Sequence, residues 1–208
     1  MTRPHSTIHA IAAAVVGDES IDLRGRTSPD GAVTLLFTDV ADAEEIAAEL
    51  GSESANQVFG DYRTMVSRVV EALEGDVVRS ERDGFLISFT SVHGALYCAT
   101  QLQRTFGRRQ ISGARRPFQL RIGLHTGHVI ADAQRLFGRT VVLAARIADR
   151  SQGGEILVSS TLKRYMETDP RYRFERLGDF YLRGVAGEHT LYSVRWQETV
   201  EPSRARDL

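Results

Sequence analysis

Two acidic side chains stand where the sequence pattern predicts a strand end and a tight turn. Asp39 follows the apolar, β-prone run Val33 to Phe37, and Asp83 lies in the short turn Arg82-Asp83-Gly84. If that strand lies beside the hairpin, the two carboxylates come together. Carboxylate oxygens suit hard divalent cations, and two such ions can neutralise a nucleoside triphosphate during in-line displacement. The same residues could instead serve structure alone, Asp83 in an Asp-Gly turn and Asp39 as a helix cap.

The hydrophobic pattern predicts the elements that must hold these carboxylates. Apolar residues recur with helical spacing over 43–50, Val58–Leu73, Ser91–Phe106 and Thr140–Asp149, and a further short helix is expected at Ile11–Val16. Short β-prone runs predict strands at Val33–Phe37, Val77–Ser80, Phe85–Phe89, Phe118–His125, Ile156–Val158 and within the stretch that ends at Val194. Alternation in the run Phe118–His125 must send Arg121 to the face opposite Phe118.

This order of elements predicts an α+β domain with a ferredoxin-like, split βαβ core. Its sheet is expected to be rich in antiparallel pairs, with the two main helices on one face. The other face would be uncovered and would have to meet a ligand, a second subunit or both. The pattern places this domain at residues 32–195, after a leader with a short helix at 1–31 and before a flexible tail at 196–208.

The composition is that of an ordinary folded protein, and it excludes several classes of function. The 208 residues are 42% hydrophobic and 25% charged with a formal net charge of −1, so no basic excess favours nucleic-acid binding. The single cysteine, Cys98, rules out an internal disulfide and is expected to be a buried small hydrophobe. Because the apolar run Ile11–Val16 is too short to cross a bilayer, we expect a cytoplasmic protein that does not bind a membrane.

Six segments carry a resemblance to a known family. They are VTLLFTDV, VVRSERDGFLISF, LRIGLHTGHV, FGRTVVLAARIA, GGEILVSS and LGDFYLRGVAGEHTLYSV. Their order and spacing resemble those of class III nucleotidyl (adenylate/guanylate) cyclase catalytic domains, and the match is closest to the actinobacterial type. The resemblance covers residues 33–194. It implies an enzyme of signal transduction that converts a nucleoside triphosphate into a 3′,5′-cyclic nucleotide and pyrophosphate.

The resemblance also implies where metal ions are held. Asp39 and Asp83 match the two metal-binding aspartates of the family, and the backbone carbonyl of Val40 matches an additional ligand. The two ions, Mg²⁺ or Mn²⁺, would activate the ribose 3′-hydroxyl for attack on the α-phosphorus and would hold the triphosphate. Such a reaction needs positioning and positive charge far more than it needs a nucleophilic side chain.

Three arginines match family positions that carry positive charge. The resemblance assigns Arg121 and Arg183 to the phosphates and Arg146 to the charged transition state. In the family each site is shared across a homodimer, with the metals on one chain and the equivalents of Arg146 and Arg183 on the other. A monomer would then be inactive. Taken without its neighbouring motif, Arg146 would be a solvated arginine on a helix surface.

Four positions depart from the family pattern. Arg79 stands where the family has the lysine that reads the purine, Arg135 where it has an aspartate or threonine, and Val142 where it has the transition-state asparagine. Arg82 replaces the glycine before the second metal aspartate. Two cations at the base edge would repel each other and reject an adenine bound in the usual way. We therefore expect a non-standard base specificity and low activity, whereas Val142 could also simply pack against the core or a dimer partner.

A second class of function fits the same residues. Loss of both base-reading identities and of the asparagine is also what a catalytically degenerate, cyclase-like module would show. Such a module would bind a nucleotide or another ligand and regulate a partner. Formation of a cyclic product would identify the enzyme, whereas nucleotide or metal binding without product would identify the module. If the protein neither bound these ligands nor formed a product, it would be a dimerisation scaffold.

Overall fold

The computed structural model describes residues 7–18, 27–29, 31–107, 109–111, 113–128 and 133–196, the side chains of 133–137 excepted. The helices are α1 (Thr7–Val16), α2 (Ala43–Leu50), α3 (Ser52–Ala72), α4 (Val92–Phe106), α5 (Ala133–Arg150) and α6 (Ser160–Tyr165). The strands are β1 (Ala32–Val40), β2 (Asp76–Glu81), β3 (Gly84–Phe89), β4 (Leu120–His128), β5 (Ile156–Ser159), β6 (Arg173–Tyr181) and β7 (Glu188–Arg195). Beyond residue 196 the expected tail lies outside the described residues. Within the described ranges, no helix has the length and apolar character that a bilayer span requires.

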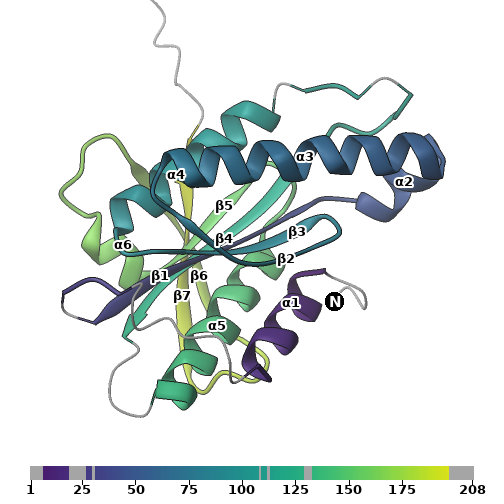
Figure 1. Ribbon diagram of the computed structural model, residues 1–208. Helices are drawn as coiled ribbons and strands as arrows, with labels where there is room; N and C mark the ends of the chain where they lie inside the picture. Colours follow the sequence, from purple (N-terminus) through teal and green to yellow (C-terminus); the bar gives the residue numbers. More distant parts are fainter. Residues whose placement is uncertain are drawn as a thin grey trace, which may run out of the picture.

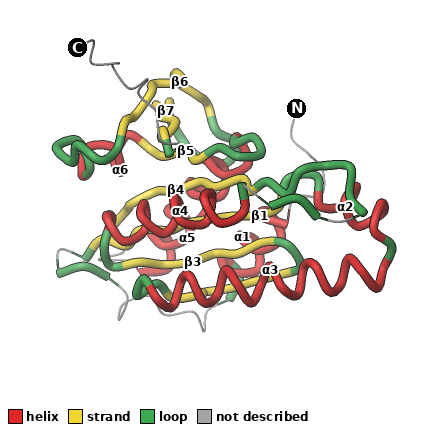
Figure 2. Tube along the Cα trace, turned by 90° about the horizontal axis from the view of Figure 1, so that it is seen from above, coloured by secondary structure: helices red, strands yellow, loops and turns green. Residues whose placement is uncertain are grey.

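A sheet of seven strands runs through the domain in the order β2-β3-β1-β4-β5-β7-β6. Neighbouring strands pair antiparallel except β4 and β5, which run parallel. Figure 2 shows the β6–β7 ribbon at one end of the sheet, away from α3. Because β1 pairs with both β3 and β4, the strand that carries Asp39 lies beside the hairpin that carries Asp83. The predicted α+β, antiparallel-rich fold is thereby confirmed.

Alternation along β1 sends its side chains into two apolar layers. Leu36 and Val40 pack with α3 and α4 in the larger core, whereas Val33, Leu35 and Phe37 pack with α1 and α5 in a second core. Figure 1 shows these two pairs of helices on opposite sides of the sheet. The expectation of an uncovered second face is therefore wrong. Every residue of β1 is buried, and a strand that is apolar on both sides needs a cover on both sides.

The long helices of the larger core follow the predicted hydrophobic period. Tyr62 and Val70 lie on the buried side of α3. At the start of α4, the Ser91 hydroxyl accepts a hydrogen bond from the backbone nitrogen of Gly94 at 3.2 Å, which satisfies one of the free N–H groups of the first turn. Cys98 is buried in this core, as expected, and burial raises the pKa of its thiol to about 12. It is therefore a packing residue.

Four helices differ from the sequence prediction. α1 and α3 begin earlier than expected, at Thr7 and Ser52. α5 begins at Ala133 rather than near Thr140, and α6 has no counterpart in the predicted order. The Ser159 hydroxyl caps α6 by accepting a hydrogen bond from the backbone nitrogen of Leu162 at 3.3 Å. A helix of six residues is too short for a helical period to be visible in the sequence, which explains the omission.

The backbones of α5 and β4 are in close contact. A Cβ atom on Gly123 would lie 2.2 Å from the backbone nitrogen of Ala148, far inside van der Waals contact. Only a residue without a side chain lets the helix and the strand approach so closely. This contact sets the position of α5, and therefore of Arg146, relative to the strand that carries Arg121.

Gly123→Ala is expected to destabilise the fold by about 1–3 kcal/mol, because the added methyl group must push α5 away from β4. Gly60→Ala on α3 is the matched control. The nearest atom to its added Cβ is 4.0 Å away, so alanine fits there and should stabilise the helix by up to about 1 kcal/mol. Urea denaturation of both variants measures the difference. Equal stability of Gly123→Ala and the parent would contradict the close approach.

Candidate active site

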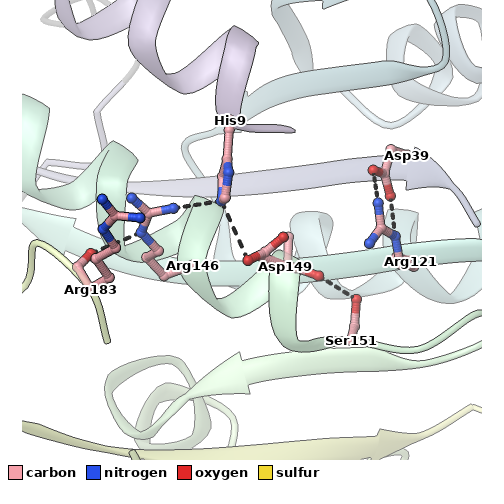
Figure 3. A network of polar contacts seen from close by, with 8 residues as sticks. His9, Asp39, Arg121, Arg146, Asp149, Ser151 and Arg183 are labelled. Atoms are coloured by element: carbon pink, nitrogen blue, oxygen red, sulfur yellow. Dashed lines mark hydrogen bonds and ion pairs between the residues drawn. The ribbon is translucent and has the colours of Figure 1, made fainter. Parts of the chain in front are cut away.

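Asp39 and Arg121 form a buried ion pair between the central strands. They are direct register partners of β1 and β4, so their side chains project side by side from the same face of the sheet. Arg121 Nε donates to Asp39 Oδ1 at 2.8 Å, and Arg121 Nη2 donates to Asp39 Oδ2. The residues are only 1% and 5% exposed. Figure 3 shows this two-pronged contact, which occupies both carboxylate oxygens.

Asp83 lies close to this pair, at the turn of the β2–β3 hairpin. Asp39, Val40, Asp83 and Arg121 line one cavity of about 650 Å³. Asp83 Oδ1 accepts a hydrogen bond from the Thr7 hydroxyl of α1 at 2.6 Å. The structure thus brings together the residues that the sequence analysis assigned to metal binding, with one of the two phosphate-binding arginines. The capping alternative for Asp39 does not apply, because α2 begins after Asp42.

Burial dominates the electrostatics of Asp39. It raises the pKa of the Asp39 carboxyl to about 7, although Arg121 acts in the opposite direction, and the neighbouring charge of Asp83 adds to the rise. The carboxyl is therefore poised between its protonated and ionised forms near neutral pH. A cation that enters the cavity would favour the ionised form and offset the effect of burial.

The chemistry of this donor set fits a hard divalent cation. Mg²⁺ is usually held by one or two carboxylates together with water and substrate phosphates, rather than by a cage of protein ligands. The described part of the chain contains no group of three or more Asp, Glu, His or Cys side chains suited to a metal ion. A cation at Asp39 would share the carboxylate with Arg121, because each oxygen has a further lone pair. At Asp83, the hydrogen bond from Thr7 falls on Oδ1, and the carboxylate keeps further lone pairs for a cation.

Arg146 and Arg183 form a second cluster on the same side of the sheet. Arg146 Nε donates to the backbone carbonyl of Arg183 at 2.8 Å, and Arg146 Nη1 contacts His9 Nε2 of α1 at 2.5 Å. Figure 3 shows this cluster separated from the Asp39–Arg121 pair, with His9 reaching down to it from α1. Neither arginine belongs to the described lining of the cavity. The structure therefore brings these two arginines together, but not to the carboxylates of their own chain.

The sequence analysis did not single out Thr7, His9 or Asp149. Asp149 Oδ2 lies 3.4 Å from His9 Nε2. Burial acts to raise the pKa of Asp149, but its contacts with His9 and the nearby arginines outweigh burial and lower that pKa. A signal for Asp149 was present, because it stands one turn after Arg146 and shares its helix face. Thr7 and His9 are the polar side chains of an otherwise apolar helix, which in retrospect marks them too.

The two positions expected to read the base have different surroundings. Arg79 Nε donates to Glu81 Oε1 at 2.8 Å, so its charge has a local partner on the same strand. Arg135 lies in the first turn of α5, and its side chain lies outside the described residues.

The structure gives a physical account of the other two departures from the family pattern. Val142 packs beside an apolar cluster that joins α5 to β5 and β7, as its packing alternative required. Arg82 has a φ of 50° as the first residue of a two-residue turn, a position at which glycine is favoured.

The Asp39–Arg121 pair predicts a pH-dependent cost of removing the arginine. Arg121→Gln should destabilise the fold by about 3–5 kcal/mol near pH 8, because it leaves a buried carboxylate without its counter-ion. The cost should shrink near pH 6, because Asp39 can then take up a proton. The sign follows from the raised pKa: between the ordinary value of 3.8 and about 7 the folded protein binds more protons than the unfolded chain, so stability falls as the pH rises through this range.

Urea denaturation of the single and double variants at both pH values measures this cost. In Asp39→Asn combined with Arg121→Gln, the loss should be smaller than the sum of the two single losses. Strictly additive losses would show that the two side chains are not coupled.

The chain is similar to several known proteins. The family model for the adenylate and guanylate cyclase catalytic domain matches residues 26–195. An uncharacterised protein of Mycobacterium tuberculosis is 32% identical over 148 residues, which are 70% of this chain and 48% of that protein. An adenylate cyclase of Mycosarcoma maydis is 29% identical over 156 residues, which are 63% of this chain and 6% of that protein. The chain thus spans about half the length of the mycobacterial relative and a small part of the other.

Solved structures show the same fold. The adenylyl cyclase CyaB from P. aeruginosa superposes with a TM-score of 0.70 at 20% identity, over 85% of this chain and 96% of that one. The guanylate cyclase domain of RhGC from Catenaria anguillulae, in complex with GTP, superposes with a TM-score of 0.67 at 18% identity, over 79% and 96%. The family model, the relatives and the fold therefore agree that this chain belongs to the class III adenylate and guanylate cyclase catalytic domain family.

Proposed function

We propose that this chain is a nucleotidyl cyclase domain that forms a 3′,5′-cyclic nucleotide and pyrophosphate from a nucleoside triphosphate. The observation that carries the proposal is the shared cavity of Asp39, Asp83 and Arg121. Phosphoryl transfer depends on cations and positive side chains held around the phosphates, and this cavity offers places for both. Among the relatives, the Mycosarcoma maydis protein is named an adenylate cyclase, and the Catenaria anguillulae domain holds GTP.

Asp39, Asp83 and the carbonyl of Val40 would hold two Mg²⁺ or Mn²⁺ ions. When bound, such ions supply Lewis acidity to the ribose 3′-hydroxyl and neutralise the triphosphate. A cation held at Asp39 would weaken the contact between Asp39 and Arg121, and the Arg121 guanidinium would then contact the phosphates. Its planar fork of N–H groups matches two phosphate oxygens as well as it matches a carboxylate.

The reaction balances without a nucleophilic side chain. The ribose 3′-oxygen bonds to the α-phosphorus while the bond from that phosphorus to the bridging oxygen breaks. Pyrophosphate leaves with that oxygen, and the hydroxyl proton passes to water. The task left to Arg121 is to position the triphosphate and to offset the charge that develops on its oxygens.

The remaining positive charge would come from a second copy of the chain. Arg146 and Arg183 lie outside the described cavity lining of their own chain, and Arg146 is bound to the Arg183 carbonyl. In a symmetric homodimer each copy would offer this cluster to the cavity of the other, so that two equivalent sites form. Arg146 would then stabilise the transition state, and Arg183 would bind the phosphates.

Base preference and turnover should both differ from the family pattern. Arg79 and Arg135 present guanidinium groups where the family reads the purine edge, so a base that offers acceptors there is favoured over adenine. Val142 offers no polar group to the ribose. Loss of one preorganised donor typically lowers the rate by about 10²–10³. We therefore propose a slow cyclase with a non-standard base specificity.

A non-catalytic module is the second candidate, and one observation favours it. The two carboxylates of the cavity that are expected to bind metal already contact side chains of the same chain, Asp39 with Arg121 and Asp83 with Thr7. A protein that kept these contacts in the presence of nucleotide would bind without turnover and act through a partner.

An assay with four nucleotides separates the two candidates. The purified chain is incubated with Mn²⁺ or Mg²⁺ and with ATP, GTP, CTP or UTP, and the products are resolved by mass. We expect a cyclic nucleotide from at least one of them, and its loss in Asp83→Asn. Asp61→Asn, at an exposed carboxylate of α3 outside the described cavity lining, is the matched control and should keep the parent activity. Nucleotide binding without product would support the module instead.

Mixing two inactive variants tests the shared site. Asp39→Ala and Arg146→Ala should each be inactive, whereas mixed dimers should regain up to about a quarter of the parent activity, because half of the dimers are mixed and each has one intact site. Arg68→Ala, at an exposed arginine of α3, is the control for loss of charge. Failure of the mixture to recover any activity would contradict a site shared between copies.

A further inference from the structure

α1 is an almost wholly apolar helix that is docked beside the candidate site. Ile8 and Ile11 are 0% exposed and Val15 is 1% exposed. They pack in the second core with residues of β1, β3 and α5, among them Leu86 and Val141. Figure 1 shows α1 next to α5 on the side of the sheet away from α3 and α4. Without α1, this part of the sheet and of α5 would expose a continuous apolar surface.

Both polar side chains of α1 contact charged residues of the candidate site. The Thr7 hydroxyl donates to Asp83 at 2.6 Å, and His9 contacts Arg146 at 2.5 Å. A Cβ atom on Gly84 would lie 2.8 Å from Thr7 Cγ2, so the first turn of α1 rests directly on the hairpin turn. α1 therefore bridges the carboxylate cavity and the arginine cluster within one chain.

The symmetry of a homodimer makes this position significant. In a two-fold interface both copies bury the same patch. Because each proposed site combines the cavity of one copy with the arginine cluster of the other, the buried patch of each copy must include both features. α1 lies between the cavity and the arginine cluster: it contacts Asp83 of the cavity and Arg146 of the cluster. A docked α1 and a second copy therefore cannot occupy this face together.

We infer that α1 is an intramolecular competitor of the second copy of this chain, and this inference rests on the proposed function. With α1 docked, the chain is a monomer in which Asp83 and Arg146 are bound by Thr7 and His9. With α1 released, the apolar face beneath it accepts a second copy, and both residues become available to the shared sites. The helix thus couples dimerisation to activity.

Opposing contributions make such an exchange feasible. Burial of three large apolar side chains favours docking of α1. Ordering ten residues opposes it, and a helix of that length is barely stable by itself in water. A second copy offers the same face an alternative apolar cover. The balance between the two covers then depends on protein concentration and on any ligand that binds one state better than the other.

Two substitutions on one helix test the inference. Ile11→Lys places a charge at a fully buried position and should undock α1, whereas Val16→Lys places the same side chain at a position that is 48% exposed. Sedimentation velocity should show that Ile11→Lys tightens dimerisation by about tenfold or more, while Val16→Lys sediments like the parent. Cyclic nucleotide formation should rise with the dimer fraction. A monomeric Ile11→Lys variant that melts like the parent would overturn the inference.

A disulfide that holds α1 in place tests the inference from the opposite direction. A Cβ atom on Gly138 of α5 would lie 3.5 Å from Val16 Cγ1, close enough for Val16→Cys and Gly138→Cys to form a bridge. The oxidised variant should stay monomeric and make no cyclic nucleotide, and reduction should restore the behaviour of the parent. The disulfide variant still tests whether α1 competes with a second copy if Ile11→Lys fails to fold. Dimers or full activity in the oxidised variant would overturn the inference.

The two readouts separate this inference from the proposed function. If Ile11→Lys dimerises and the bridged variant does not, α1 is the competitor whether or not any product forms. Absence of cyclic nucleotide from such dimers, with all four nucleotides, would then count against the cyclase and leave the role of α1 in place.

Discussion

The ion pair between Asp39 and Arg121 is the interaction on which the rest of the site depends. It joins the two central strands of the sheet at direct register partners and is almost fully withdrawn from water. Unmatched charges in such a place are costly, so a cation bound at Asp39 would favour an anion bound at Arg121. A metal ion with a triphosphate meets this condition. A free metal ion or a free anion alone leaves one of the two charges unmatched.

The fold and the convergence of the carboxylates could be predicted because they follow from local pattern. The β2–β3 hairpin is closed by a short turn, and β1 is a plain apolar run, so their pairing brings Asp39 near Asp83. The partner of Asp39 could not be predicted in the same way. Arg121 is 82 residues away in the chain, and only the register of β1 and β4 makes it the nearest cation. Local periodicity holds no information about such a register.

The cover on the second face was also missed, although a signal for it was present. In the run Val33 to Phe37, four of the five residues are apolar, and Leu35, Leu36 and Phe37 follow one another without alternation, which is typical of a strand buried on both sides. The short helix at Ile11–Val16 was predicted, but its period could not indicate which surface it covers. Its place on β1, β3 and α5 depends on tertiary packing, and so does the contact of Thr7 and His9 with the site.

The position of β2 at the edge of the sheet has an evolutionary consequence. Arg79 stands on this outermost strand, part-exposed and paired with Glu81 of the same strand, so replacing it disturbs little packing. Asp39 and Arg121 lie in the interior, where a single change leaves an unmatched charge. If Arg79 recognises the base as proposed, drift would cost less stability at this residue than at the residues proposed to handle the phosphates. A lineage of such domains would then be able to change its choice of nucleotide without first having to rebuild its core.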